Sequence, residues 1–312
     1  MAIMERGSAI AARPRPWSAL IDRPEWLSWL MIGPAVLYIV LIVGVPFVLA
    51  LYYSVSDITV GGRTLGFVGL RHFVEVLQTP KFQVALKNTF IFAITAQVLV
   101  MVLATVLALA LTWDFPGKWF VRLLILLPWV APVSLGAIGW LWIFDSTYSV
   151  LNWVVERFGL VPAYGGFMWL GVPHLAMGSI IAVHVWRILP LATVILLAGL
   201  SSIPHDIHDA AAVDGASFWR HLLQITVPLV RPIMLVAGLF GLVLAFTDMI
   251  VVFVLTRGGP YDTTQVLASL AFFTGVQAGD LAEGAAIAVF LFPLLVVAAI
   301  AFLRVARRSE VT

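Results

Sequence analysis

The sequence contains no cysteine, and charged residues make up only 11% of its 312 positions. Without cysteine there can be no disulfide and no thiolate, which excludes a disulfide-bonded scaffold, a cysteine-ligated metal site and a cysteine nucleophile. Ordinary soluble domains carry about 25% charged residues. A chain with so few cannot cover its surface with groups that water solvates well, so a soluble globular protein is excluded as well.

Hydrophobic residues take the place of the missing charge and form 62% of the chain. Inside a bilayer, only α-helices and closed β-barrels satisfy every backbone N–H and C=O group. Barrel strands alternate polar and apolar residues, and this sequence does not. It therefore predicts an all-α membrane protein. The net charge of +2, with arginines mostly near the chain ends, indicates no nucleic-acid partner.

Catalytic motifs are also missing. The segment Phe115-Pro116-Gly117-Lys118-Trp119 lacks the preceding glycine and the following hydroxyl of a phosphate-binding loop, so no ATP site is expected on this chain. No acid, base and nucleophile converge, which argues against a membrane-embedded enzyme. His205 and His208 lie three residues apart in a polar segment, which favours a solvated helix face over a metal site.

Six stretches are long and apolar enough to cross a hydrocarbon core, which takes about 20 helical residues. The stretch nearest the N-terminus is too long for a signal peptide and is expected to stay in the mature protein. The predicted spans cover residues 29–53, 88–113, 120–144, 174–200, 233–256 and 285–305.

Basic residues predict the orientation of these spans. Eleven Lys and Arg residues fall on the side of the two termini and six on the other side, and the side richer in Lys and Arg is the cytoplasmic one. We therefore expect a multi-pass protein of the cell membrane with two cytoplasmic tails, at 1–28 and 306–312, around a six-helix transmembrane domain at 29–305.

The outer segments hold two further patterns. Residues 67–85 place apolar side chains at helical spacing and predict an amphipathic helix at the membrane surface. Four tryptophans near the outer ends of the third and fourth spans fit either an aromatic belt at the lipid headgroups or a surface that stacks on a sugar ring. These are Trp140, Trp142, Trp153 and Trp169.

The loop between the fourth and fifth spans, residues 201–232, is too patterned for a passive connection. Pro204 suits a helix start, Gly215 a left-handed helix end and Ser217 the cap of a second helix. The spacing of Phe218, Leu222 and Ile225 predicts that this second helix packs on the membrane helices. The first helix would offer a smooth face of Ala210, Ala211 and Ala212, with Asp209 as a negative anchor; an ordinary cytoplasmic hairpin is the alternative.

At these positions the sequence resembles the permease subunits of binding-protein-dependent ABC importers. Their loop signature is E-A-A, three residues, G, nine residues, I-x-L-P, and the spacing is kept in full by Asp209-Ala210-Ala211, Gly215 and Ile225-Thr226-Val227-Pro228. Asp209 replaces the glutamate and Val227 the leucine. The resemblance implies that a separate ATPase docks on this loop. The implied coupling residues are Asp209, Ala210, Ala211, Asp214, Gly215, Ile225 and Pro228.

Three further segments are similar to the sugar-type branch of the family. They are Trp140–Phe144 leading to Leu151-Asn152, Trp186–Pro190, and Thr256–Pro260. The resemblance implies the type I importer permease fold and a carbohydrate or related polar cargo. It also implies a second permease subunit, of a different chain, two copies of an ABC ATPase that bind the ATP and magnesium, and an extracytoplasmic solute-binding protein.

Two charges fall inside predicted spans, where ionisable groups are costly and mark a cavity or a partner. Counted along the helices, Arg187 would lie roughly 20 Å and Asp248 roughly 10 Å from the outer surface, so the sequence favours separate positions lining a pore or vestibule over a direct ion pair. A structural role with backbone partners is the third alternative. A carbohydrate path also needs hydrogen-bonding and aromatic groups. Besides Arg187 and Asp248, the candidates are Asn152, Tyr148, Trp142 and Gln97, with Asp145 and Thr247 as further polar groups.

Gly258, Gly259 and Pro260 follow the fifth span and predict a tight turn, or alternatively an outer gate facing the binding protein. An ATP-independent secondary transporter or channel is the other functional class to consider. It should show inverted repeats or paired broken helices with coupling carboxylates, for which Asp248 alone is a thin basis.

Overall fold

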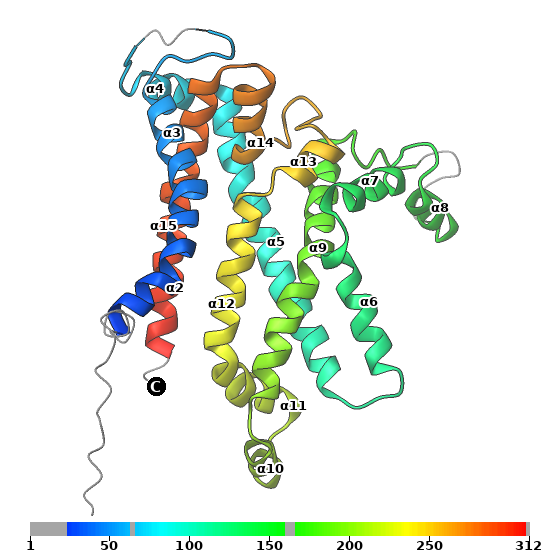
Figure 1. Cartoon of the computed structure of the whole chain (residues 1–312). Coiled ribbons are helices and arrows are strands. Elements are labelled where there is room, and N and C mark those ends of the chain that lie inside the picture. Colours follow the sequence, from blue (N-terminus) through cyan, green and yellow to red (C-terminus); the bar gives the residue numbers. More distant parts are fainter. Residues whose placement is uncertain (1–23, 63–65, 160–165, 310–312) are drawn as a thin grey trace, which may run out of the picture. The chain divides into compact units, whose positions relative to one another are not determined.

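The computed structural model describes residues 24–62, 66–159 and 166–309, and most of them are helical (Figure 1). The chain divides into two units, residues 1–52 and 53–312. Most of the predicted N-terminal tail and the last three residues, 310–312, lie outside the described part.

The first unit contains one apolar helical run. It consists of α2 (Pro24–Ile39), a π-helical turn η1 (Val40–Gly44) and α3 (Val45–Ser54). The boundary between the units falls within α3, after Tyr52. The stretch Ser28–Ser54 is long enough to cross a membrane, and no residue in its apolar window is buried.

The second unit holds the remaining helices of the described chain. They are α4 (Arg71–Gln78), α5 (Pro80–Thr112), α6 (Lys118–Val130), α7 (Val133–Ile143), α8 (Val150–Arg157), α9 (Pro173–Ser201), α10 (His205–Val213), α11 (Phe218–His221), η2 (Leu222–Thr226), α12 (Val227–Phe246), α13 (Ile250–Leu255), α14 (Leu267–Phe272), η3 (Phe273–Gln277) and α15 (Leu281–Ser309).

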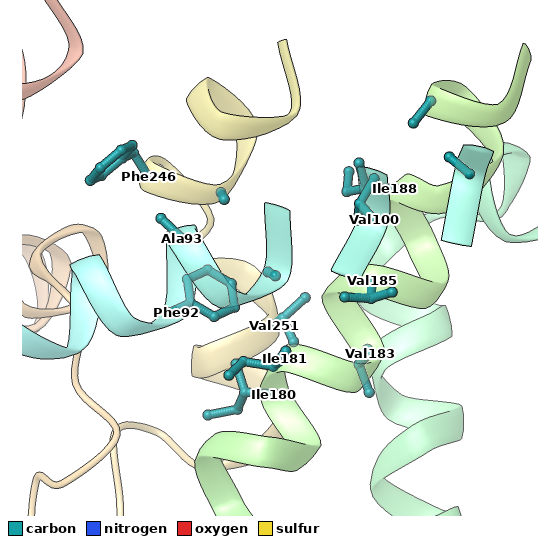
Figure 2. Close-up of a cluster of buried hydrophobic side chains, with 14 of the residues drawn as sticks. Phe92, Ala93, Val100, Ile180, Ile181, Val183, Val185, Ile188, Phe246 and Val251 are labelled. Carbon is teal, nitrogen blue, oxygen red and sulfur yellow. The ribbon is translucent and has the colours of Figure 1, made fainter. Parts of the chain in front are cut away.

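The core of this unit is the packing of α5, α9 and α12. Figure 2 shows Phe92 and Ala93 of α5 beside Ile180 and Ile181 of α9, with Val251 of α13 against them. Small side chains permit close approach of membrane helices. Along α5 this role falls to alanines with no exposed surface: Ala93, Ala96, Ala104 and Ala108.

A second apolar cluster joins α4 and α5 to α14 and α15. Val76 and Phe82 pack with Leu267 and Ile287, and all four are almost completely buried. The amphipathic segment predicted at 67–85 is shorter than expected. Pro80 favours an extended conformation at the residue before it and itself suits the first turn of a helix, so α4 ends at Gln78 and α5 begins at Pro80.

Among the described residues, five helices are long and apolar enough to cross a membrane, or six when the bent pair α6–α7 counts as one span. The prediction of a single helix over 120–144 is wrong, because α6 and α7 meet at an angle of 98°. Pro132 accounts for the break: it holds Ala131 in an extended conformation at φ −64° and ψ 138°, which ends α6.

The fifth span also differs from the predicted 233–256. It runs from Phe218 through a π-helical turn to Phe246, and Ile250–Leu255 forms a separate short helix. Pro228 and Pro232 stand near its start without ending it. Prolines are tolerated in membrane helices where the local hydrogen bonding adjusts, and the π-helical turn directly before Val227 is such an adjustment.

Candidate functional site

The loop between α9 and α12 is built around the short helix α10. Pro204 precedes its first residue, and Gly215 follows its end with φ +67°. The Ala216 N–H donates to the Ala211 carbonyl at 3.0 Å and the Gly215 N–H to the Ala212 carbonyl at 3.1 Å. This pair of bonds is a Schellman motif, which requires the left-handed conformation that glycine adopts without cost. Gly215 therefore ends α10 as the sequence predicts.

The exposed face of α10 carries the predicted anchor. Asp209, Ala210, Ala212 and Asp214 are exposed, whereas Ala211 is buried, so the prediction that Ala211 belongs to the smooth outward face is wrong. Short connections at 202–204 and 214–217 join α10 to α9 and α11. A helix held at both ends with a small-residue face outward can enter a groove of another protein.

The second helix of the predicted helix-turn-helix does not exist as a separate element, because α11 continues through η2 into α12. Ser217 occupies the N-cap position without a capping hydrogen bond from its side chain. Phe218 was expected to pack inward and is 59% exposed, while Leu222 and Ile225 are half-buried. Pro228 lies in the first turn of α12 and is exposed.

A polar cluster joins α9 to the break between α12 and α13. The Asp248 carboxylate accepts a hydrogen bond from His184 Nδ1 at 2.6 Å and one from Arg187 Nη2 at 2.6 Å. Its other oxygen accepts from the Val251 N–H at 3.3 Å. Asp248 and His184 are buried, and the Arg187 side chain is 19% exposed. A carboxylate can remain charged at this depth only with such partners.

The expectation that Arg187 and Asp248 lie too far apart to pair is wrong. It assumed a straight fifth helix to residue 256, whereas α12 ends at Phe246 and turns Asp248 toward α9. His184 was not among the predicted residues. Its spacing of three from Arg187 puts both on one face of α9, and that spacing is the signal that could have found it.

Gln97 lies on α5, where this helix packs against α12. Its side chain is buried, and neither atom of its amide has a hydrogen-bond partner among the described residues. It packs directly over Gly241, where a Cβ atom would collide with the amide oxygen. An unpaired amide inside a membrane protein is costly, so the NH2 and C=O groups of Gln97 are polar groups that the described structure leaves without a partner.

The other predicted path residues lie at the end of α7, on α8 and between these two helices. Trp142 and Tyr148 are 75% and 86% exposed. The Asn152 amide is used by the chain itself, since it donates to the Phe167 carbonyl and accepts from the Phe167 N–H and from Trp169 Nε1. Asn152 thus holds the segment at Phe167 and Trp169 against α8.

The backbone N–H groups of Tyr148 and Thr147 lower the pKa of Asp145 by donating hydrogen bonds to its carboxylate.

Gly258, Gly259 and Pro260 belong to the loop between α13 and α14, which hydrogen bonds hold in place. Gly258 has φ +87° and no space for a Cβ atom beside Gln265. The Asn88 amide on α5 donates to the carbonyls of Thr263 and Gln265, at 2.7 and 3.0 Å. These bonds pin the loop to α5, so it is more than a simple turn.

The family model of binding-protein-dependent transport system inner membrane components matches residues 101–311. This chain belongs to that family. The matched part contains α10, the Asp248 cluster and the loop between α13 and α14. The chain is a non-catalytic permease subunit of an ABC importer and a multi-pass membrane protein.

Similar proteins with known names are also permease proteins of transport systems. The trehalose/maltose transport system permease protein MalF of Thermococcus litoralis is 31% identical over 93% of this chain and 97% of its own length. The sulfoquinovosyl glycerol transport system permease protein SmoG of Agrobacterium fabrum is 29% identical over 92% of this chain and 96% of its own.

Solved structures show the same fold. A bacterial ABC transporter that imports the acidic polysaccharide alginate contains a chain with a TM-score of 0.79 and 21% identity, covering 94% of this permease and 98% of that chain. The predicted all-α type I importer fold and the resemblance to ABC importer permeases are thereby confirmed.

Proposed function

We propose that this permease carries a carbohydrate or related polar solute into the cytoplasm, and that an ATPase drives it through α10. In this proposal a second permease of a different chain completes the path. Two copies of an ABC ATPase bind the ATP and magnesium, and an extracytoplasmic solute-binding protein delivers the cargo. The named relatives that transport trehalose/maltose and sulfoquinovosyl glycerol support a carbohydrate cargo.

The observation that carries the coupling role is the exposed face of α10, held in place by the Schellman motif at Gly215. Asp209 and Ala210 supply the contact surface, and Asp214 and Gly215 set the end of the helix. Ile225 and Pro228 belong to the continuous helical run of α11, η2 and α12, which would transmit a movement of α10 into the membrane.

Replacing Gly215 by Val tests this role against a matched control. Gly215 and Gly117 both have positive φ, +67° and +81°, and a Cβ atom added to either would have no neighbour within 4 Å. Each substitution carries the same backbone penalty, about 1–2 kcal/mol, but only Gly215 borders α10. In the reconstituted importer, Gly215→Val should lower the ATPase stimulation given by loaded binding protein, and Gly117→Val should not. Equal effects of the two would remove the coupling role.

Arg187, Asp248 and Gln97 are the proposed solute-path residues inside the membrane, and the outer loop at Gly258, Gly259 and Pro260 is the proposed gate. A panel of sugars presented to the assembled importer identifies the cargo through stimulated ATPase activity. Gln97→Leu should raise the KM for uptake without changing the basal ATPase rate, because it removes one donor and one acceptor from the path. A flat response to every sugar would end the carbohydrate assignment.

A further inference from the structure

Two hollows lie at the coupling-loop end of the second unit. The first, the apolar hollow, encloses about 850 Å³ between the end of α5 and the run from α11 into α12. Its walls include Val106 and Ala110 of α5 and Leu223 and Val227 across from them. Ligand cavities in proteins span about 300–1,000 Å³, so this hollow is large enough for a substantial apolar group.

The second, the basic hollow, encloses about 500 Å³ beside α10. Lysine, arginine and histidine residues from three helices, α6, α10 and α11, line one space there, together with hydroxyl-bearing residues, and none of its described lining residues is acidic. The polar lining consists of Lys118, Arg122, His205, His208 and His221, with the hydroxyl-bearing Thr112, Ser201 and Thr226.

The two hollows are continuous. Leu109, Trp113, Phe218 and Leu222 line both of them. Trp113 and Phe218 are 72% and 59% exposed, and they lie at the boundary between the apolar hollow and the basic hollow. Exposed aromatic side chains at such a boundary are typical of the level of lipid headgroups.

We propose that these hollows together bind one anionic phospholipid, with its phosphate in the basic hollow and its acyl chains in the apolar one. A soluble phosphate compound would use the basic hollow and leave the apolar hollow unfilled, and a zwitterionic lipid would bring no net charge to the basic residues. Only an anionic amphiphile matches both. The placement of this site at the cytoplasmic leaflet rests on the proposed orientation.

The cations of the basic hollow are available to a headgroup. Lys118 pairs with Asp114 at 3.0 Å, and the Asp114 side chain is fully exposed. The Lys118 side chain is itself only 20% exposed, but water surrounds its partner carboxylate and weakens the pair, so a phosphate can replace Asp114. Arg122 is exposed beside it. Because His205 and His208 belong to α10, a headgroup there would bridge α10 to the start of α6 and steady the coupling helix.

Native mass spectrometry of the purified importer, in nanodiscs of phosphatidylglycerol or of phosphatidylcholine, tests the site. The wild type should retain phosphatidylglycerol in preference to phosphatidylcholine. Each basic residue next to an anionic headgroup contributes about a factor of five in affinity, so Lys118→Gln with Arg122→Gln should weaken retention about 25-fold. Arg231→Gln is the matched control, since Arg231 is an exposed arginine that lines neither hollow.

A second variant tests the apolar hollow without changing charge. Ala110 is exposed within it, so Ala110→Trp should fill the space for the acyl chains and lower phosphatidylglycerol retention on a fold that keeps every cation. Inorganic phosphate at millimolar concentration should not displace the lipid from the wild type. Displacement by phosphate alone, with no effect of Ala110→Trp, would show a site for a free anion and overturn the proposal.

Equal retention of both lipids by the wild type, or unchanged retention in the double variant, would also overturn it. So would loss of the lipid when the ATPase assembles, because the basic hollow would then belong to the ATPase interface. These results are separate from the transport proposal. An importer that assembles and takes up its cargo but shows no lipid preference refutes only the lipid site.

Discussion

At the scale of single residues, the interaction with the largest consequence is the one between Asp248 and its two partners. Replacing Asp248 by Ala leaves the cationic side chain of Arg187 in the membrane without its counter-charge. Breaking one side of a buried pair costs about 3–5 kcal/mol. Unfolding of the purified protein in detergent should show this loss for Asp248→Ala.

Two comparisons keep that prediction specific. Asp209→Ala removes an exposed carboxylate from α10 and should leave the stability unchanged while it uncouples transport. Replacing both members of the pair, Asp248→Leu with Arg187→Leu, should recover most of the stability, since an apolar pair of similar size replaces a buried ion pair at little cost. A double variant as unstable as Asp248→Ala would contradict this account.

A second residue-scale prediction concerns the crossing of η3 and α15. Gly284 packs directly on the backbone of Gly275, and a Cβ atom there would meet main chain that cannot move aside. Gly284→Ala should therefore destabilise the protein by at least the 1–3 kcal/mol typical of overpacking. Gly139→Ala on α7, where nothing lies within 4 Å, is the control and should be neutral or slightly stabilising. The midpoints of thermal unfolding compare the two.

At the scale of elements, the loop around α10 should respond to pH. Burial, followed by the neighbouring charges of His221 and His205, lowers the pKa of His208, and Asp209 only partly opposes this. His208 also lies 2.9 Å from His221, ring nitrogen to ring nitrogen. The folded loop thus favours neutral His208.

Because the pKa of His208 is lower in the folded loop than in the unfolded chain, its contribution to stability is present above a pH of about 6.5 and is lost as the pH falls through the folded value. The protection factors of the α10 amides, which correct for the intrinsic pH dependence of exchange, should therefore fall as the pH is lowered from 7.5 to 5.5. His208→Gln should flatten this dependence. An equally steep dependence in the variant would assign the effect to other groups.

At the scale of the whole molecule, the absence of cysteine makes the orientation easy to test. Val213 on α10 and Tyr261 on the outer loop are 88% and 95% exposed. With single cysteines introduced at these positions, a membrane-impermeant maleimide should label Tyr261→Cys in intact cells and Val213→Cys only after permeabilisation. The reverse pattern would invert the orientation expected from the distribution of Lys and Arg.

The sequence predicts the molecule best where local chemistry decides. Composition is sufficient for the all-α membrane class, and the requirement for φ > 0 identifies Gly215 as the end of α10. The sequence predicts least about bends and breaks in helices, because these depend on how one element packs against another. A run of apolar residues looks the same whether it is straight or bent, so the 98° break at Pro132 and the end of α12 at Phe246 were missed. The pairing of Asp248 depended on that second break.

The connections around α10 have a mechanical consequence. α9 leaves one end of α10 and the run into α12 leaves the other, and the two meet again where His184 and Arg187 hold Asp248. The two helices are therefore connected at both ends, by α10 and by the ion pair. They cannot slide past each other unless one of these connections breaks. The α9 side, from Ser201 to Arg187, is about 21 Å of helix, and the other side, from Phe218 to Phe246, is about 42 Å. In the proposed coupling, a displacement of α10 therefore reaches the ion pair through two helices of unequal length.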